Sequence, residues 1–205
     1  MKDTKRNEKF LWLGNHPAID FANTEIVENG RTVDLLEKPQ DLLDWMGAAK
    51  MLTGQALKDA RHLADSRLEE ALRLAREYRL ALKDALEHLQ RHGRLHKDPA
   101  AVRKTNRLLS QPRTAFALSA AERSLQLKQD WAIAEAEDLS RPIAFSFAQL
   151  LTTQDLTRIR KCQNPDCVLF FLDVSKSGTR SWCSMQICGN KLRVAAFRKR
   201  HGNDG

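Results

Sequence analysis

Four cysteines stand near the C-terminal end of this 205-residue chain, in two pairs of equal spacing. Four residues separate Cys162 from Cys167, fifteen residues follow, and four residues again separate Cys183 from Cys188. Two close pairs one hairpin apart are typical of a tetrahedral four-thiolate zinc site. Disulfides are the alternative, with three possible pairings, but they need an oxidising compartment. We therefore expect one structural zinc ion, because four protein ligands leave no coordination position open for catalysis.

The residues around the cysteines favour a particular local fold. The turn-forming residues 163–166 (Gln-Asn-Pro-Asp) would present the first pair on a backbone knuckle. The second pair leads into a helical run over residues 192–200, and the free N–H groups at a helix start stabilise thiolates. One pair on a knuckle and the other at a helix start is the treble-clef arrangement, which we predict for this module.

The cysteine segment also carries nearly all of the net charge of +8. Residues 158–205 hold ten Lys and Arg against three Asp, a net charge of +7, whereas the first 157 residues hold 24 Lys and Arg against 23 acids. Such a cluster favours a polyanionic partner, nucleic acid first, because cations displace counterions from phosphates. The alternative is a solvated tail that serves solubility. The cations that we expect to contact DNA are Arg180, Lys191, Arg193, Arg198, Lys199 and Arg200.

The same stretch closely resembles the CGNR zinc finger family. Residues 160–191 (RKCQNPDCVLFFLDVSKSGTRSWCSMQICGNK) share with it the first cysteine pair, the Asn-Pro-Asp turn, the Leu-Phe-Phe-Leu-Asp strand, the Arg-Ser-Trp-Cys-Ser-Met run and Cys-Gly-Asn. The family has Arg where this chain has Lys191, which keeps the charge but weakens bidentate contacts. Upstream, residues 13–24 (LGNHPAIDFANT) resemble the opening of the ABATE domain, with Asn15 and Ala22 in place of the usual Gly and Val. The resemblance implies a stress-induced transcription regulator.

Short polar side chains gather in an apolar segment of the body, at His16, Asp20, Asn23 and Thr24. They could line a pocket for a small-molecule effector that governs the zinc module. The alternative, which we favour, is that they satisfy backbone groups at turns and helix ends.

Three histidines recur every four residues, at His88, His92 and His96, and suggest a second metal site. However, Gly93 breaks the expected helix between the last two, and the segment HLQRH lacks the Glu of a metalloprotease helix. We interpret these histidines as a solvated helix end. The sequence contains no Gly-rich phosphate loop, nucleophile elbow or cysteine left free for catalysis, so we expect no enzyme.

The elements that position these residues predict an α+β fold, with a mostly helical body and a small antiparallel sheet. Residues 11–13 suggest a short strand, Asn29-Gly30 a tight hairpin, and Pro39 the start of a helix. Apolar residues at three- and four-residue steps predict one long helix over 54–92, ended by Gly93.

Further along, alternating residues at 114–118 and 124–128 predict a second hairpin, and helices are expected over 99–110 and 142–151. Thr152 or Thr153 is expected to cap a short helix that runs into Arg160. We expect an ABATE-like domain over 1–155 and a zinc finger over 156–205.

No stretch approaches the roughly 20 apolar residues of a membrane span, and the charged start MKDTKRNEKF lacks the apolar core of a secretion signal. We therefore expect a cytoplasmic transcription regulator that binds DNA through its zinc module, with a possible small effector in the body. The alternative is a ligand-binding protein whose zinc module is only structural or mediates protein contacts. An enzyme hidden in the body is the weakest of the three hypotheses.

Overall fold

The computed structural model of the chain describes residues 9–111, 113–121, 124–191 and 193–194. Its helices are α1 (Pro17–Ala22), α2 (Pro39–Ala48), α3 (Gly54–Arg61), α4 (Asp65–His92), α5 (Ala100–Leu109) and α6 (Arg141–Thr153), with shorter helical turns η1 (Ala136–Ser140), η2 (Leu156–Arg158) and η3 (Met185–Gly189). Its strands are β1 (Glu25–Glu28), β2 (Arg31–Asp34), β3 (Thr114–Ala121), β4 (Ser124–Trp131), β5 (Ile159–Lys161) and β6 (Phe170–Leu172). Each strand pairs antiparallel with the next one along the chain, so the predicted mostly helical α+β fold is confirmed.

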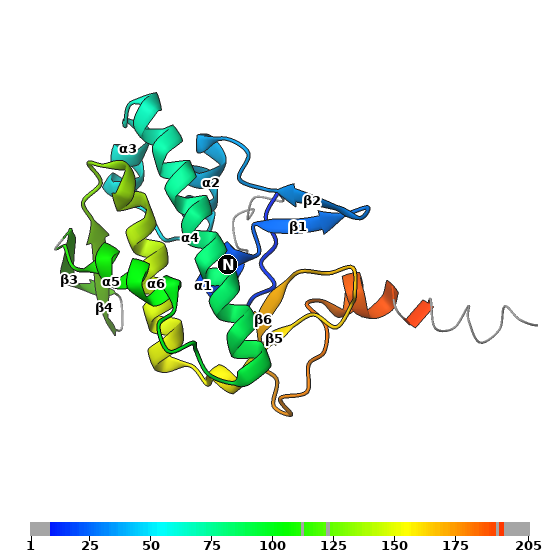
Figure 1. The fold of residues 1–205 in the computed structure, drawn as a ribbon. Coiled ribbons are helices and arrows are strands. Elements are labelled where there is room, and N and C mark those ends of the chain that lie inside the picture. The colour runs from blue at the N-terminus through cyan, green and yellow to red at the C-terminus, as the bar shows by residue number, and fades with distance from the viewer. Residues whose placement is uncertain (1–8, 112, 122–123, 192, 195–205) are drawn as a thin grey trace, which may run out of the picture.

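Helix α4 is the centre of the body and packs against α1, α2, α5 and η1, while α6 packs against α1 and α5 (Figure 1). It ends where predicted, at Gly93, which adopts φ +66° and donates its N–H to the carbonyl of Leu89 at 2.8 Å. None of the described helices, α4 included, is both long and apolar enough to cross a bilayer. The apolar residues buried along α4 recur at the predicted three- and four-residue steps: Ala71, Leu72, Ala75, Tyr78, Leu82, Ala85, Leu86 and Leu89.

The prediction of one helix over 54–92 is wrong, because residues 62–64 separate α3 from α4. Helix α3 closes with a bond from the N–H of Leu63 to the carbonyl of Ala60, and the extended Ala64 (φ −60°, ψ 147°) then begins α4. The break lets α3 pack against α2 and bury Ala56 and Ala60. Both helices keep the same apolar period, so periodicity cannot locate the break between them.

Both predicted hairpins are confirmed. Asn29 (φ 50°) and Gly30 (φ 76°) form the turn between β1 and β2, and both adopt the left-handed conformation that this turn requires. The second hairpin, β3–β4, is longer than predicted and pairs Thr114 with Trp131 at its open end. The predicted helices at Pro39, 99–110 and 142–151 are present as α2, α5 and α6.

The short helix predicted to run from Thr152 or Thr153 into Arg160 is present only as the three-residue turn η2, and its predicted cap is wrong. Helix α6 continues to Thr153, the turn η2 follows, and the chain then extends into β5. The cap of η2 is Asp155, whose carboxylate accepts the N–H of Thr157 at 3.0 Å. The chain extends at β5 because that strand pairs with β6, which the local sequence does not reveal.

The segment before α1 forms the junction with the C-terminal part of the chain, and the predicted strand at 11–13 is absent from it. The carbonyl of Gly14 instead accepts the N–H of Leu172 in β6 at 2.9 Å, and Figure 1 shows this segment beside β6. A Cβ on Gly14 would lie 2.8 Å from the side chain of Ile19 and 2.9 Å from the backbone N of Asp20. Only glycine therefore fits at this close approach.

Candidate metal centre

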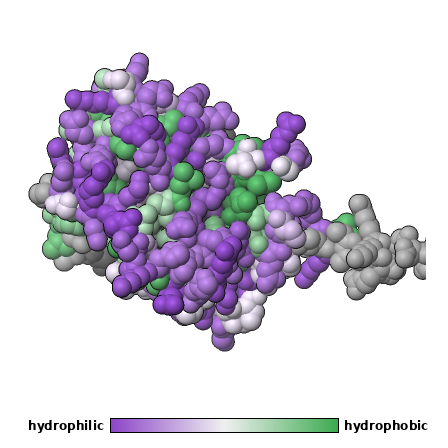
Figure 2. Space-filling model, in the orientation of Figure 1, coloured by the Kyte–Doolittle hydropathy of each residue, from purple (hydrophilic) through white to green (hydrophobic). Residues whose placement is uncertain are grey.

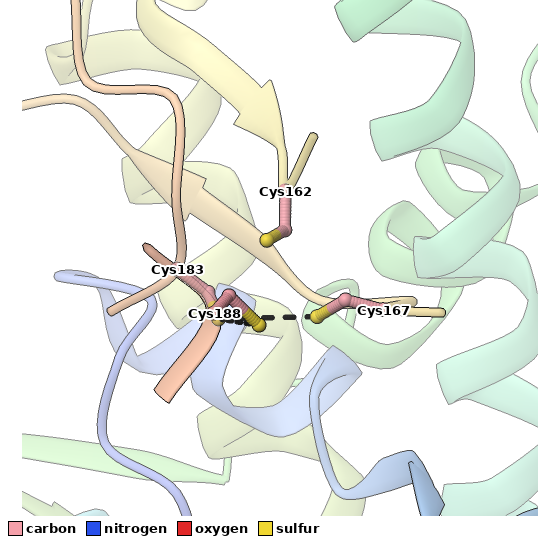
Figure 3. Close-up of side chains that lie close together, drawn as sticks. All are labelled: Cys162, Cys167, Cys183 and Cys188. Atoms are coloured by element: carbon pink, nitrogen blue, oxygen red, sulfur yellow. Dashed lines mark hydrogen bonds between the residues drawn. The ribbon is translucent and has the colours of Figure 1, made fainter. Parts of the chain in front are cut away.

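The four cysteines converge from three short elements (Figure 3). Cys162 directly follows β5, and the predicted turn carries the chain to Cys167, whose N–H bonds to the carbonyl of Asn164 at 2.9 Å. Cys183 and Cys188 lie on either side of the start of η3. Three of the four cysteines are buried, and Cys167 is half-buried. The knuckle predicted from Gln-Asn-Pro-Asp is thus present.

The sulfur geometry fits one tetrahedral zinc ion. All four Sγ atoms lie within 4.8 Å of one another, and Sγ of Cys183 lies 3.8 Å from that of Cys167 and 3.5 Å from that of Cys188. A zinc–sulfur bond of about 2.3 Å predicts sulfur separations of about 3.8 Å. A disulfide would require about 2.05 Å, and all four thiols are free. The four cysteines therefore form one structural zinc site, as predicted.

The thiols perturb one another strongly. Hydrogen bonds from Cys167 and Cys183 hold the pKa of Cys162 far below its usual value. The same contacts raise the pKa of Cys167 and of Cys183, because a second thiolate beside the first is unfavourable. A divalent cation removes this repulsion, since zinc binds all four groups as thiolates.

A side chain that the sequence reasoning did not single out supports the centre from the knuckle. The buried amide of Asn164 donates Nδ2–H to Sγ of Cys188 at 3.3 Å and accepts the N–H of Asp166 at 3.2 Å. It thereby links the first cysteine pair to the second, as outer-shell groups of zinc sites do. The Asn-Pro-Asp motif signalled a turn but did not reveal this second contact.

The loop between the two pairs is ordered by Asp173, which is fully buried. Its carboxylate accepts the N–H and the hydroxyl of Ser175 and the N–H of Arg180, at 2.6–2.9 Å. Burial alone would raise the pKa of Asp173, but these hydrogen bonds lower it. The carboxylate therefore stays charged and holds the loop that leads to Cys183.

Arg180, one of the cations expected to contact DNA, already serves the fold. Its guanidinium donates to the carbonyls of Leu13, Trp182 and Cys183. It also lies over the ring of Phe171, with 4.1 Å between Cζ and the ring centroid. It thus joins the body, β6 and the zinc centre. Its contacts with the segment before α1 span 167 positions and leave no local signal in the sequence.

Two other expected DNA contacts lie at the exposed end of the module. Lys191 and Arg193 belong to the helical residues that begin at Asn190, and both are exposed. Nζ of Lys191 lies 3.4 Å from a carboxylate oxygen of Asp166, and both side chains are largely exposed. Arg198, Lys199 and Arg200 lie outside the described residues, as does most of the predicted helix, so the treble-clef arrangement stays a prediction.

The four polar residues of the body all hold backbone groups, as the alternative that we favoured predicts. His16 caps α1, and Asp20 accepts the N–H of Gly14 at 2.7 Å. Thr24 donates to the carbonyl of Phe21 and accepts from Arg79. These contacts show which groups the side chains serve in the fold, and a ligand role for the four residues stays a prediction.

Asn23 performs the most specific of these roles. Its buried amide donates Nδ2–H to the carbonyl of Phe170 at 2.8 Å and accepts the N–H of Phe170 at 2.9 Å. It therefore pairs with β6 as a neighbouring strand would, and it fixes the zinc module to the end of α1.

Comparison with known families supports both parts of this architecture. The family model for ABATE, described as "Putative stress-induced transcription regulator", matches residues 15–154. The chain belongs to the ABATE family. A second model, the CGNR zinc finger, matches residues 158–201, which include all four zinc ligands. No curated protein matches the chain. The two models follow one another in the order that the sequence predicts, which identifies an ABATE family protein with a C-terminal zinc finger.

Proposed function

We propose that this ABATE protein is a transcription regulator, and not an enzyme, that docks its zinc module on DNA. The observation that carries the proposal is the position of Lys191 and Arg193, which are exposed directly after the last zinc ligand, Cys188. The zinc centre fixes the start of this segment, so its cations extend from a rigid base. Residues 158–205 carry a net charge of +7, which favours phosphate as the partner.

The two cations differ from Arg180 in their availability. The contact between Lys191 and Asp166 is an exposed pair of 3.4 Å, and such pairs contribute little. A phosphate could therefore replace Asp166 at small cost. Arg180, in contrast, would have to leave three carbonyls and an aromatic ring. We propose Lys191 and Arg193 as phosphate contacts, together with Arg198, Lys199 and Arg200 from the sequence. Arg180 makes no contact with DNA in this proposal and supports binding only by stabilising the zinc module.

Fluorescence anisotropy with duplex DNA over a range of salt concentrations tests this proposal. Binding should weaken steeply as salt rises, and changing both Lys191→Gln and Arg193→Gln should reduce the slope of log affinity against log salt by about 1.8. The matched control changes Lys58→Gln and Arg61→Gln, two exposed cations of α3 in the body. If the control variant reduces the slope of log affinity against log salt as much as the test variant does, the docking surface lies elsewhere.

A cavity between the two parts of the chain favours effector control as a second candidate function. A space of about 580 Å³ lies between the β1–β2 hairpin and the zinc module, and Figure 2 shows hydrophobic residues there. Ile26 and Val27 line it from the hairpin, and Val168, Leu169 and Ile187 line it from the module. The zinc ligands Cys167, Cys183 and Cys188 also line it, so a bound zinc ion takes up part of this space. Cavities that are largely apolar and lie between domains are preferred ligand sites. We propose that a small, mainly apolar effector enters here, rather than beside His16, Asp20, Asn23 and Thr24.

The dye anilinonaphthalene sulfonate provides a direct probe of this cavity. The folded, zinc-loaded protein should enhance its fluorescence, and Ile187→Glu should abolish the enhancement by placing a charge in the cavity wall. The control is Val174→Glu, since Val174 is an exposed apolar residue of the module that does not line the cavity. Equal dye binding by the two variants would contradict the assignment. Control of DNA binding further requires that the bound dye change the affinity for duplex DNA.

A further inference from the structure

The left-handed turn at Gly93 brings together three histidines that the sequence separates. His88 and His92 lie one turn apart on α4, and their ring centroids are 4.3 Å apart. After Gly93 (φ +66°) the chain doubles back, and the ring of His96 lies against that of His88, with 3.5 Å between centroids. In the sequence, the helix end at Gly93 argued against a metal site. In the structure, the same turn brings the imidazole of His96 back to that of His88.

A carboxylate completes the cluster. Asp84 precedes His88 by one helical turn on the same face of α4, because residues four apart are neighbours on a helix. One of its carboxylate oxygens lies 3.9 Å from Nε2 of His96. Four groups of the kinds that bind transition metals thus adjoin one another at the C-terminal end of α4.

We propose that Asp84, His88, His92 and His96 form a second metal site, which takes Zn²⁺ or a similar divalent transition-metal ion. Imidazole and carboxylate are the ligands that such ions accept, and a histidine pair four residues apart on a helix chelates them from one side.

The cluster differs from the cysteine centre in how far it is organised. Among the described residues, only the four cysteines have ligand atoms that already converge, whereas the histidine rings lie against one another at tilts of 42° and 31°. His92, His96 and Asp84 are exposed, so their side chains can rotate to turn nitrogen and oxygen atoms toward one ion. The ordering of four side chains weakens binding, and we expect a reversible site rather than a permanent one.

The position of the site gives a bound ion a structural effect. Glu87, the neighbour of His88, accepts a hydrogen bond from Lys161 of β5 at 2.9 Å. An ion held by His96 would tie the connection between α4 and α5 to this same end of α4. Metal binding would thus stiffen the part of the body that contacts the zinc module.

Equilibrium dialysis of the full, zinc-loaded chain against micromolar Zn²⁺, followed by elemental analysis, tests the proposal. The wild type should take up a second zinc ion per chain beyond the one held by the cysteines. Changing His88→Gln and His92→Gln together should remove this uptake and leave the cysteine-bound zinc in place. His96→Gln should weaken the second site by about ten-fold or more, because its ligand set then loses one member.

The matched control is His62→Gln, since His62 is exposed at the end of α3 and belongs to no cluster described here. It should keep the second ion. Circular dichroism checks that each variant stays folded. The proposal is overturned if the wild type binds only the cysteine zinc, or if the double variant still takes up the second ion as the wild type does.

Discussion

Replacing Asn23 by Ala tests whether the junction between body and zinc module depends on one side chain. The amide is buried and provides both partners of the Phe170 backbone, at 2.8 and 2.9 Å. Ala removes both partners and leaves a buried N–H and a buried carbonyl unsatisfied.

The magnitude follows from these two groups. An unsatisfied buried polar group costs about 1–3 kcal/mol, so two cost about 2–6 kcal/mol. Water that enters the space left by the amide recovers part of this, and we expect the free energy of unfolding to fall by about 3 kcal/mol. For a chain of this length that corresponds to a decrease in Tm of about 6–12 °C. Asn23→Asp should destabilise as well, because it sets a carboxylate oxygen against the carbonyl of Phe170.

Urea denaturation followed by tryptophan fluorescence, with zinc in excess so that the cysteine centre stays loaded, measures the effect. The control is Asn106→Ala, because Asn106 is exposed on α5. It should change the free energy of unfolding by less than about 0.5 kcal/mol. If Asn23→Ala has an effect as small as the control at unchanged m-value, the double hydrogen bond does not hold the junction and the reasoning fails.

Three further perturbations have defined outcomes. Cys183→Ser removes a zinc ligand, so elemental analysis should find the zinc lost while circular dichroism still shows the helices of the body. Arg180→Lys loses the forked donor and the contact with Phe171, which should lower the free energy of unfolding in urea by about 1–2 kcal/mol and speed zinc release to a chelator. Burial would raise the pKa of Asp34, but the hydrogen bond and charge of Arg79 hold it low. Its stabilisation is therefore present above the pKa of the unfolded state, about 3.9, and is lost as pH falls through the lower folded value. Acid titration of stability should show that loss in the wild type, and a loss of equal size in Asp34→Asn would contradict it.

The parts of the structure that were predictable carry their signal locally. The spacing of Cys162, Cys167, Cys183 and Cys188 fixes both the metal and its ligands, because a tetrahedral site needs two close pairs. The turn at Asn29-Gly30 and the end of α4 at Gly93 were predictable because both positions need a left-handed backbone. Helices with one apolar face were predictable because their apolar residues recur at three- and four-residue steps within one segment.

The parts that were not predictable depend on contacts between distant residues. Asn23 and Phe170 are 147 positions apart, so the role of the amide could not be read from either segment. Arg180 looked like a surface cation because its carbonyl acceptors are invisible in sequence. The position of His96 depends on the direction in which Gly93 turns the chain, whereas spacing alone describes a straight helix.

The junction through Gly14, Asn23 and Phe170 also sets an order for folding during synthesis. Gly14 and Asn23, on either side of α1, leave the ribosome early, but their partners in β6 follow much later, 147 positions later for Asn23. Domains generally fold from the N-terminus as they emerge. Here the first segment must wait for β6, so helices α2 to α6 can gather around α4 before either end of the chain is fixed. A chain that stops short of β6 therefore leaves Gly14 and Asn23 without these backbone partners, and capture of zinc by Cys183 and Cys188 can only follow the synthesis of β6.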